Sequence, residues 1–168
     1  MGPRASSVAA AVAAVVAAGV ASGAAAPAPL VTAGYPYARS CPGAGERDDV
    51  DRWRMNTCNC TSYVAWALEA NGYRVDWFVA GAMDAWNWPH VARLAHLAVG
   101  GTPRVGSVAV WRRWGRFGHL AFVTAVNRNG TFSVAEYNLP RGPAFRYDRR
   151  GLISAHGVTF IYVPHRPA

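Results

Sequence analysis

The sequence predicts one α+β domain in which short helices come first and an antiparallel β-sheet follows. Two observations carry this prediction. Apolar residues repeat at helical spacing over residues 60–70, and after Gly100-Gly101 the pattern changes to short runs rich in β-branched and aromatic residues. The part of the chain downstream of the N-terminal segment, about 140 residues, is long enough for one domain with its own hydrophobic core.

The first helix is predicted over residues 60–70, because its apolar residues lie three and four positions apart. Asn71-Gly72 ends it, since both residues are common just after a helix. Residues 80–97 predict one or two further short helices, interrupted at Pro89. The apolar residues of the first helix are Tyr63, Val64, Ala67 and Leu68.

Four strands are predicted after the helices. Asn129-Gly130 stands between the second and third, and this dipeptide between two alternating runs indicates a β-hairpin. The fourth run is expected to close the sheet. The predicted strands cover residues 107–112, 119–127, 131–137 and 158–163.

Residues 1–26 are typical of a secretory signal peptide. One arginine and no acid precede an alanine-rich apolar run over residues 8–20, and small residues follow. This run is short for a membrane helix and is not followed by a basic stop. We therefore expect a secreted protein with no membrane anchor after cleavage, with residues 27–48 as an N-terminal tail and loop and residues 49–165 as the folded domain.

The formal net charge is +8, and all of the positive charge comes from arginine because the chain has no lysine. Loss of Arg4 with the signal peptide would leave +7. A basic secreted domain is attracted to anionic polymers, and cell-wall carboxylates and phosphates are the extracellular candidates. We expect a cell-wall partner and a monomer, and we do not expect nucleic acid as a partner.

Cys60 opens the predicted helix, and a helix N-terminus favours a thiolate over a thiol. His119 begins a predicted strand, and Glu136 and Asn138 lie on its expected hairpin partner. Glu136 and Asn138 are two positions apart on a strand and are therefore expected to share one face, where either could orient the imidazole of His119. A thiol, a base and an orienting group are the parts of a cysteine hydrolase.

Three cysteines leave an odd thiol in an oxidising compartment. We expect Cys41 to pair with Cys58, which leaves Cys60 free, whereas a Cys41–Cys60 pair would silence the enzyme. Cys58-Asn59-Cys60 is tighter than the usual spacing of zinc ligands. We expect no metal or cofactor, because the aspartates near residue 50 also lack the alternating spacing of a calcium loop, and we interpret Asp48, Asp49 and Asp51 as a solvated loop.

Tryptophans supply candidates for a substrate groove. Trp53, Trp111 and Trp114 are predicted to bind substrate, whereas Trp66 and Trp86 are assigned to core or rim packing. His90, His96, His156 and His165 have no comparable surroundings and are expected in surface or capping roles.

Four blocks of the sequence stand out, namely residues 51–53 with 60–66, residues 81–86, residues 103–111, and residues 118–123 with 134–138. Together they resemble the CHAP family of cysteine, histidine-dependent amidohydrolases and peptidases. The resemblance implies a papain-like fold and hydrolysis of an amide bond in peptidoglycan, either between muramic acid and the stem peptide or within the stem or cross-bridge. It also implies Cys60 as the nucleophile, His119 as the base, and Glu136 and Asn138 as its polar partners. Asn59 and Ala82 depart from the family pattern, but neither replaces a reacting group.

Two other functions are also compatible with the sequence. A secreted module that binds cell wall or a partner surface would keep the fold without catalysis. Such a module would not need the complete set of Cys60, His119, Glu136 and Asn138. A thiol transacylase would use the same cysteine and is distinguished by its product, since hydrolysis releases a free carboxylate. Which amide bond is cut depends on the shape of the groove and not on the reacting residues.

Overall fold

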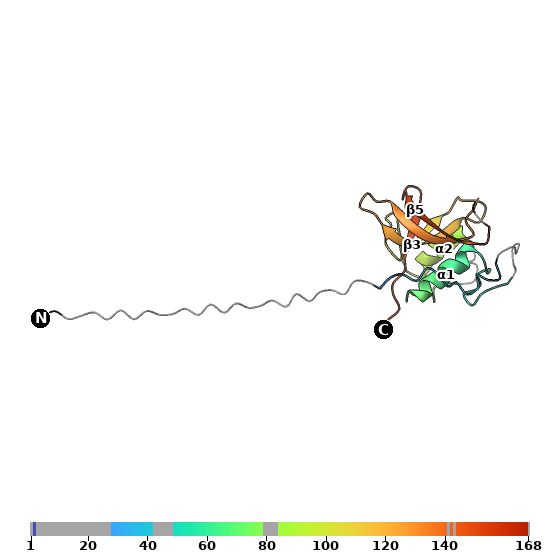
Figure 1. The fold of residues 1–168 in the computed structure, drawn as a ribbon, viewed down its shortest axis with the longest axis horizontal. Helices are drawn as coiled ribbons and strands as arrows, with labels where there is room; N and C mark the ends of the chain where they lie inside the picture. The colour runs from blue at the N-terminus through green and yellow to red at the C-terminus, as the bar shows by residue number, and fades with distance from the viewer. Residues whose placement is uncertain are drawn as a thin grey trace.

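The computed structural model describes residue 2 and residues 28–41, 49–78, 84–140, 142 and 144–167. The predicted signal peptide lies outside these residues apart from Gly2, and so do residues 80–83 of the second predicted helical segment. The predicted order of helices first and strands afterwards is confirmed (Figure 1). The elements are α1 (Cys60–Ala70), the 3-10 helix η1 (Ala85–Asn87), α2 (Trp88–Leu94), β1 (Ala98–Gly100), β2 (Val108–Trp111), β3 (His119–Val126), β4 (Phe132–Tyr137), β5 (Tyr147–Ile153) and β6 (Thr159–Tyr162).

The six strands form one antiparallel sheet in the order β1-β6-β2-β3-β4-β5. The hairpin predicted at Asn129-Gly130 joins β3 to β4, and Gly130 takes the positive φ of 80° that the turn requires. Trp111 on β2 is opposite His119 on β3, and Val134 on β4 is opposite Arg150 on β5. The sheet thus places β2, β3, β4 and β5, which come from separate parts of the sequence, side by side.

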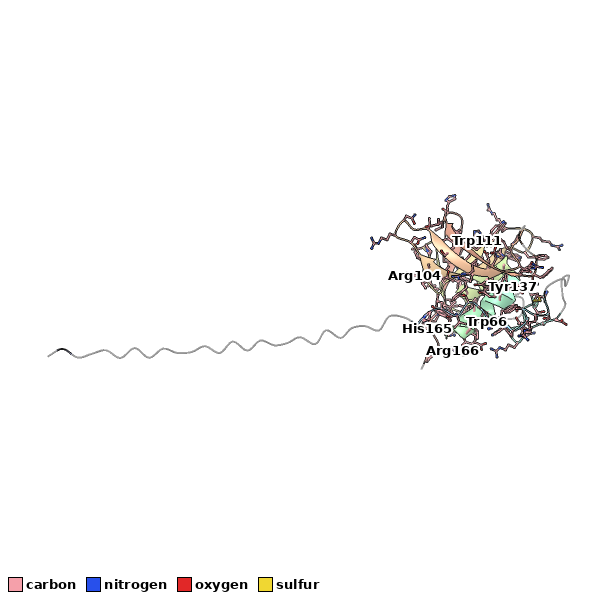
Figure 2. All side chains as sticks on the ribbon, in the orientation of Figure 1. Trp66, Arg104, Trp111, Tyr137, His165 and Arg166 are labelled. Atoms are coloured by element: carbon pink, nitrogen blue, oxygen red, sulfur yellow. A yellow bond between two sulfur atoms is a disulfide. The ribbon has the colours of Figure 1, made fainter. Side chains whose placement is uncertain are left out.

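A hydrophobic core lies on each face of the sheet. α1 packs against β3 and β4 and is buried along most of its length, which its nearly continuous apolar sequence explains. Tyr63, Leu68 and Phe122 belong to this larger core. The opposite face holds a smaller core that includes Phe132 and Phe160. Figure 2 labels Trp66, which lies on α1 and belongs to the larger core, and Trp111, which lies on β2 and packs against the smaller core.

Two strands were not predicted from the sequence. β1 is three residues long and contains a glycine. β5 forms an edge of the sheet and has the sequence Tyr-Asp-Arg-Arg-Gly-Leu-Ile, in which charged residues break the apolar alternation. Because β1 pairs with β6, β6 lies inside the sheet and does not close it, which corrects the prediction for residues 158–163.

One assignment of a single residue is wrong. Asp51 is not part of a solvated loop, because it is buried and its Oδ1 accepts hydrogen bonds from the N–H groups of Trp53 and Met55, both at 2.9 Å. Trp86, which was expected in core or rim packing, lies at the rim, since it is 41% exposed. Its indole N–H donates to Asp84 at the surface. Within the part of the chain that the structure describes, no helix is long and apolar enough to cross a membrane.

Candidate active site

Cys60 is the first residue of α1, and its thiol is half-buried. Asn59, which precedes it, has an extended backbone and makes no side-chain capping bond to the helix. The N–H groups of a first helical turn have no partner inside the helix, so this end of α1 can receive negative charge. Cys60 opens into a hollow of about 170 Å³ whose wall includes Asp84, Phe117 and Gly118.

A disulfide holds the segment in front of Cys60. Cys41 and Cys58 form this bond with their Cα atoms 5.5 Å apart, so Cys60 is the free thiol of the three cysteines. The N–H of Cys58 donates to the Tyr35 hydroxyl at 3.1 Å, and the same hydroxyl hydrogen-bonds to Ser62 on α1. Residues 28–41 are thereby tied to both sides of the cysteine.

His119 is the first residue of β3, and its side chain is buried. The chain enters the strand through Gly118, which has a φ of 72°. A Cβ at this position would lie 2.8 Å from the backbone nitrogen of Trp86, so a larger residue would push β3 away from η1. Gly118 therefore lets His119 start the strand in close contact with the wall of the Cys60 hollow.

The two ring nitrogens of His119 have different surroundings. Nε2 lies 2.7 Å from Oε2 of Glu136. Nδ1 is buried and has no hydrogen-bond partner among the described residues, and the side chain of Cys60 lies near enough to raise the pKa of the ring. If Nε2–H donates to the carboxylate, Nδ1 carries the lone pair and can accept a proton from the thiol.

The pKa of His119 reflects opposing influences. Burial by itself lowers it, but the negative charges of a Cys60 thiolate and the Glu136 carboxylate outweigh burial and raise the pKa to about 9. The imidazole of His119 is therefore favoured in its protonated form at neutral pH.

Glu136 is fully buried on β4 and has charged partners on both sides. Arg150 on β5 donates from Nε to Oε1 and from Nη2 to Oε2, the second at 2.9 Å, while His119 contacts Oε2. Burial alone would raise the pKa of Glu136, but the hydrogen bonds from His119 and Arg150 outweigh it and hold the pKa below its usual value. The carboxylate stays ionised inside the protein.

Asn138 does not share the face of Glu136, contrary to the prediction from spacing. β4 ends at Tyr137, and Asn138 has a φ of 52°, which turns its side chain away from the strand alternation. Its amide donates to Oδ1 of Asn59 at 2.7 Å and its Oδ1 accepts from the N–H of Phe145 at 3.0 Å. In the described structure Asn138 thus contacts the residue before the thiol, and Glu136 contacts the imidazole.

The three tryptophans proposed as a groove wall lie in different places. Trp53 is only 7% exposed, with the Arg52 guanidinium over its ring. Trp111 and Trp114 are half-buried, and their rings lie beside that of His119 at centroid distances of 5.9 and 5.4 Å.

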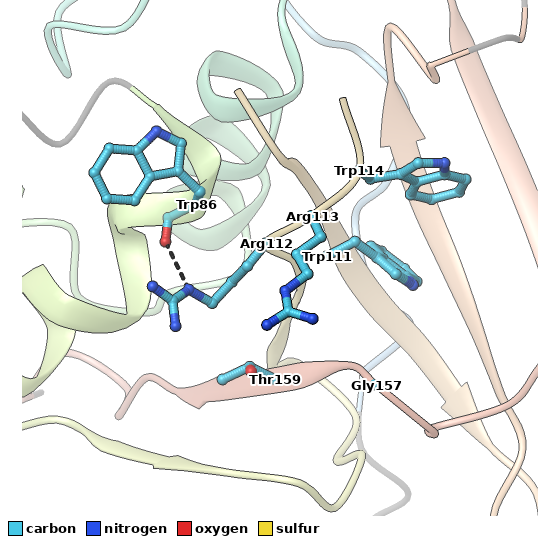
Figure 3. Close-up of a pocket in the computed structure, with 7 residues that line it drawn as sticks. All are labelled: Trp86, Trp111, Arg112, Arg113, Trp114, Gly157 and Thr159. Atoms are coloured by element: carbon cyan, nitrogen blue, oxygen red, sulfur yellow. Dashed lines mark hydrogen bonds between the residues drawn. The ribbon is translucent and has the colours of Figure 1, made fainter. Parts of the chain in front are cut away.

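Trp111 and Trp114 also line a larger hollow of about 700 Å³ between η1 and β6 (Figure 3). Arg112 and Arg113 point into this hollow, and Arg112 donates to the backbone oxygen of Trp86 at 3.2 Å. The N–H of Trp86 donates to the backbone oxygen of Phe117, which lines the Cys60 hollow. One backbone hydrogen bond therefore joins a residue that lines the larger hollow to a residue that lines the Cys60 hollow.

Arg150 is the member of the site that the sequence did not suggest. Arg149-Arg150 is typical of two exposed charges, and no periodicity in the sequence predicts that the two side chains have different surroundings. The only available signal is that a buried Glu136 needs a cation near it. The strand register, which places Arg150 on the same face of the sheet as Glu136, is a tertiary property.

Comparisons with known proteins agree with this arrangement. The CHAP domain family matches residues 50–138, which is more than half of the chain. Staphylococcal secretory antigen ssaA2 of Staphylococcus aureus (strain MRSA252) is 36% identical over 80 residues, covering 47% of this chain and 29% of that protein. The crystal structure of an N-acetylmuramoyl-L-alanine amidase from Staphylococcus aureus superposes with a TM-score of 0.55 at 25% identity, over 63% of this chain and 30% of that one. This chain thus spans less than a third of the length of either relative.

Proposed function

Because this chain belongs to the CHAP domain family, we propose that it hydrolyses an amide bond of peptidoglycan through the Cys60 thiol. The observation that carries the proposal is the geometry of His119. Its Nε2 is hydrogen-bonded to a buried carboxylate, its Nδ1 is buried and available to accept a proton, and Cys60 lies near enough to raise the pKa of the ring. A binding module has no need of a buried, oriented imidazole next to a free thiol. The fold would be papain-like, with residues 49–165 as the catalytic domain.

In the proposed reaction, Nδ1 of His119 takes the proton of Cys60, and the thiolate attacks the carbonyl carbon of the amide. When the C–N bond breaks, the imidazolium gives its proton to the leaving amine, and the acyl group stays on sulfur as a thioester. Water then loses a proton to Nδ1 and attacks the thioester. The carboxylic acid leaves, and the proton on His119 returns to the Cys60 sulfur and regenerates the thiol. The net change is one amide and one water converted to one acid and one amine.

The oxyanion formed at each step would be received by backbone N–H groups at the start of α1, with that of Cys60 as the first candidate. Removing one such donor typically raises the barrier by about 3 to 4 kcal/mol. Asn138 supports this end of the helix, because it bonds to Asn59 immediately before Cys60. We assign Glu136 to orientation of His119 and Asn138 to positioning of the helix start.

The substrate would bring negative charge to the hollow beside the active site. Arg112 and Arg113 line this hollow, and the described residues of its lining include no acidic side chain. Together with the net charge of +8, this favours carboxylates of the stem peptide or phosphates of wall polymers as partners. Trp111 and Trp114 remain candidates for contact with substrate, whereas Trp53 has little exposed surface to offer.

Secretion fits this function. The amide bonds of peptidoglycan lie outside the cell membrane, residues 1–26 have the pattern of a signal peptide, and the relative from Staphylococcus aureus is called a secretory antigen. We propose that the protein acts in or on the cell wall as a monomer, without a metal or cofactor.

The test is digestion of purified peptidoglycan from several wall types, followed by mass spectrometry of the released fragments. The expected result is one new amine and one new carboxylate for each bond cut, and their positions distinguish an amidase from an endopeptidase. Acyl groups moved onto another amine, with no free carboxylate, would indicate a transacylase. Wall binding without any new ends in all wall types would contradict the proposal in favour of a binding module.

A further inference from the structure

Arg150 links the buried carboxylate of the active site to the two tryptophans beside it. Its side chain reaches from the edge strand β5 and is 25% exposed, whereas Glu136 is fully buried. The guanidinium meets both oxygens of Glu136, from Nε to Oε1 and from Nη2 to Oε2. A two-point contact of this kind fixes the plane of the carboxylate as well as its position.

The same guanidinium is covered by aromatic rings. Its central carbon lies 5.0 Å from the ring centroid of Trp111 and 4.9 Å from that of Trp114. The two rings are 5.3 Å apart and also contact His119, with Trp114 edge-on to the imidazole. One tryptophan pair therefore covers both cationic partners of Glu136 and limits the approach of water to them.

From these contacts we propose that Arg150, held by Trp111 and Trp114, is a positioning residue that fixes Glu136 and through it the direction of His119 Nδ1 toward Cys60. The inference rests on the proposed function, since it assigns a role in the same reaction. It gives Trp111 and Trp114 a role that the sequence did not suggest, because they hold the arginine whether or not they also contact substrate.

A guanidinium suits this position better than an ammonium. It remains protonated at every pH at which a protein is folded, and its planar fork matches a carboxylate. Oε2 of Glu136 accepts from both Arg150 and His119, so rotation of the carboxylate would break contacts to both. Without Arg150 the buried carboxyl group would lose one of the two cations that keep it ionised, and would be free to turn away from the ring.

The experiment compares Arg150→Gln and Arg150→Lys with the parent chain and with Arg149→Gln. Arg149 is a matched control, because it is the adjacent arginine on β5 and its side chain is exposed. Two quantities are measured across pH: kcat and KM for wall hydrolysis, and the rate at which iodoacetamide alkylates Cys60. The second needs no substrate, so it reports on the site even if the proposed function fails.

For Arg150→Gln we expect kcat to fall about 10²-fold with little change in KM, since a misplaced catalytic group costs about this much. The acid limb of both pH profiles should move to higher pH, because the carboxyl group has lost a cation. Arg150→Lys should restore the acid limb while kcat remains low, since the charge returns without the fork. Arg149→Gln should behave like the parent.

Parental kcat and parental pH profiles in Arg150→Gln would overturn the inference, and so would an equal loss in Arg149→Gln. If Arg150→Gln does not fold, Arg150→Lys decides by the same readouts. A low kcat with the parental acid limb supports the inference, and a parental kcat overturns it. If the parent itself cuts no wall, the proposed function fails, and the alkylation profiles alone decide the role of Arg150.

Discussion

Replacing Cys60 by alanine is expected to lower wall hydrolysis by about 10⁴-fold or more, to the level left by binding and backbone donors alone. The proposed reaction forms its covalent bond at this sulfur, and no other cysteine can substitute because Cys41 and Cys58 are joined to each other. The measurement is the rate of release of soluble fragments from purified peptidoglycan under identical conditions for the two proteins.

Thermal unfolding serves as the control for this variant. Cys60 is half-buried and takes no part in the disulfide, so Cys60→Ala should unfold close to the temperature of the parent. Cys60→Ser should also be inactive, since an alcohol is far harder to ionise than a thiol and His119 is arranged for a thiolate. An active Cys60→Ala protein would contradict the proposed mechanism outright.

Replacing Glu136 by glutamine is expected to reduce both activity and stability. The amide preserves the size of the side chain but removes the charge that faces His119 and Arg150. Breaking one side of a buried ionic network typically costs about 3 to 5 kcal/mol. Loss of the group that orients a catalytic imidazole typically lowers kcat by about 10²- to 10⁴-fold. Chemical denaturation and wall-digestion rates measure the two effects.

The pH dependence gives this variant a second signature. The pKa of folded His119 is about 9 against an ordinary 6.5, so its stabilising interactions are fully present below 6.5 and are lost as pH rises through 9. The pKa of folded Glu136 is lowered from 4.5, so its contribution is present above 4.5 and is lost as pH falls through the folded value. In the parent, the alkaline limb of activity should therefore lie near 9, and in Glu136→Gln it should move to lower pH.

Glu69→Gln is a suitable control for Glu136→Gln. Glu69 pairs with Arg52, whose side chain is 66% exposed, and such surface pairs contribute only about 0 to 1 kcal/mol. Glu69→Gln should leave activity and its alkaline limb unchanged. An equal loss of stability in both variants, or an alkaline limb that stays in place in Glu136→Gln, would contradict the role assigned to the buried carboxylate.

Local signals were enough to predict the elements that carry Cys60 and His119. Helical spacing with an Asn-Gly stop locates α1, and Asn129-Gly130 between two alternating runs locates the hairpin of β3 and β4. The residue types around these elements also suggested Glu136 as a partner of the histidine. These are features of short stretches of chain, which propensity and pattern can capture.

The remaining parts of the site depend on tertiary structure. β5 carries Arg150 but lies at an edge where charged residues are favoured, so its sequence lacks the apolar alternation of an inner strand. Asn138 leaves the strand through a positive φ that spacing along β4 does not reveal. Asp51 is buried and accepts hydrogen bonds from the backbone of the turn that follows it. The acidic composition of this segment does not reveal that local contact.

The role of Cys60 as the nucleophile can be tested by titrating wall hydrolysis against alkylation of its thiol. Because Cys60 is the single free thiol, iodoacetamide should add one group per chain, and mass mapping can place it. Activity should fall in proportion to the modified fraction and reach background when every Cys60 is alkylated. Wall hydrolysis that continues at the parental rate in fully alkylated protein would contradict the role of Cys60 as the nucleophile.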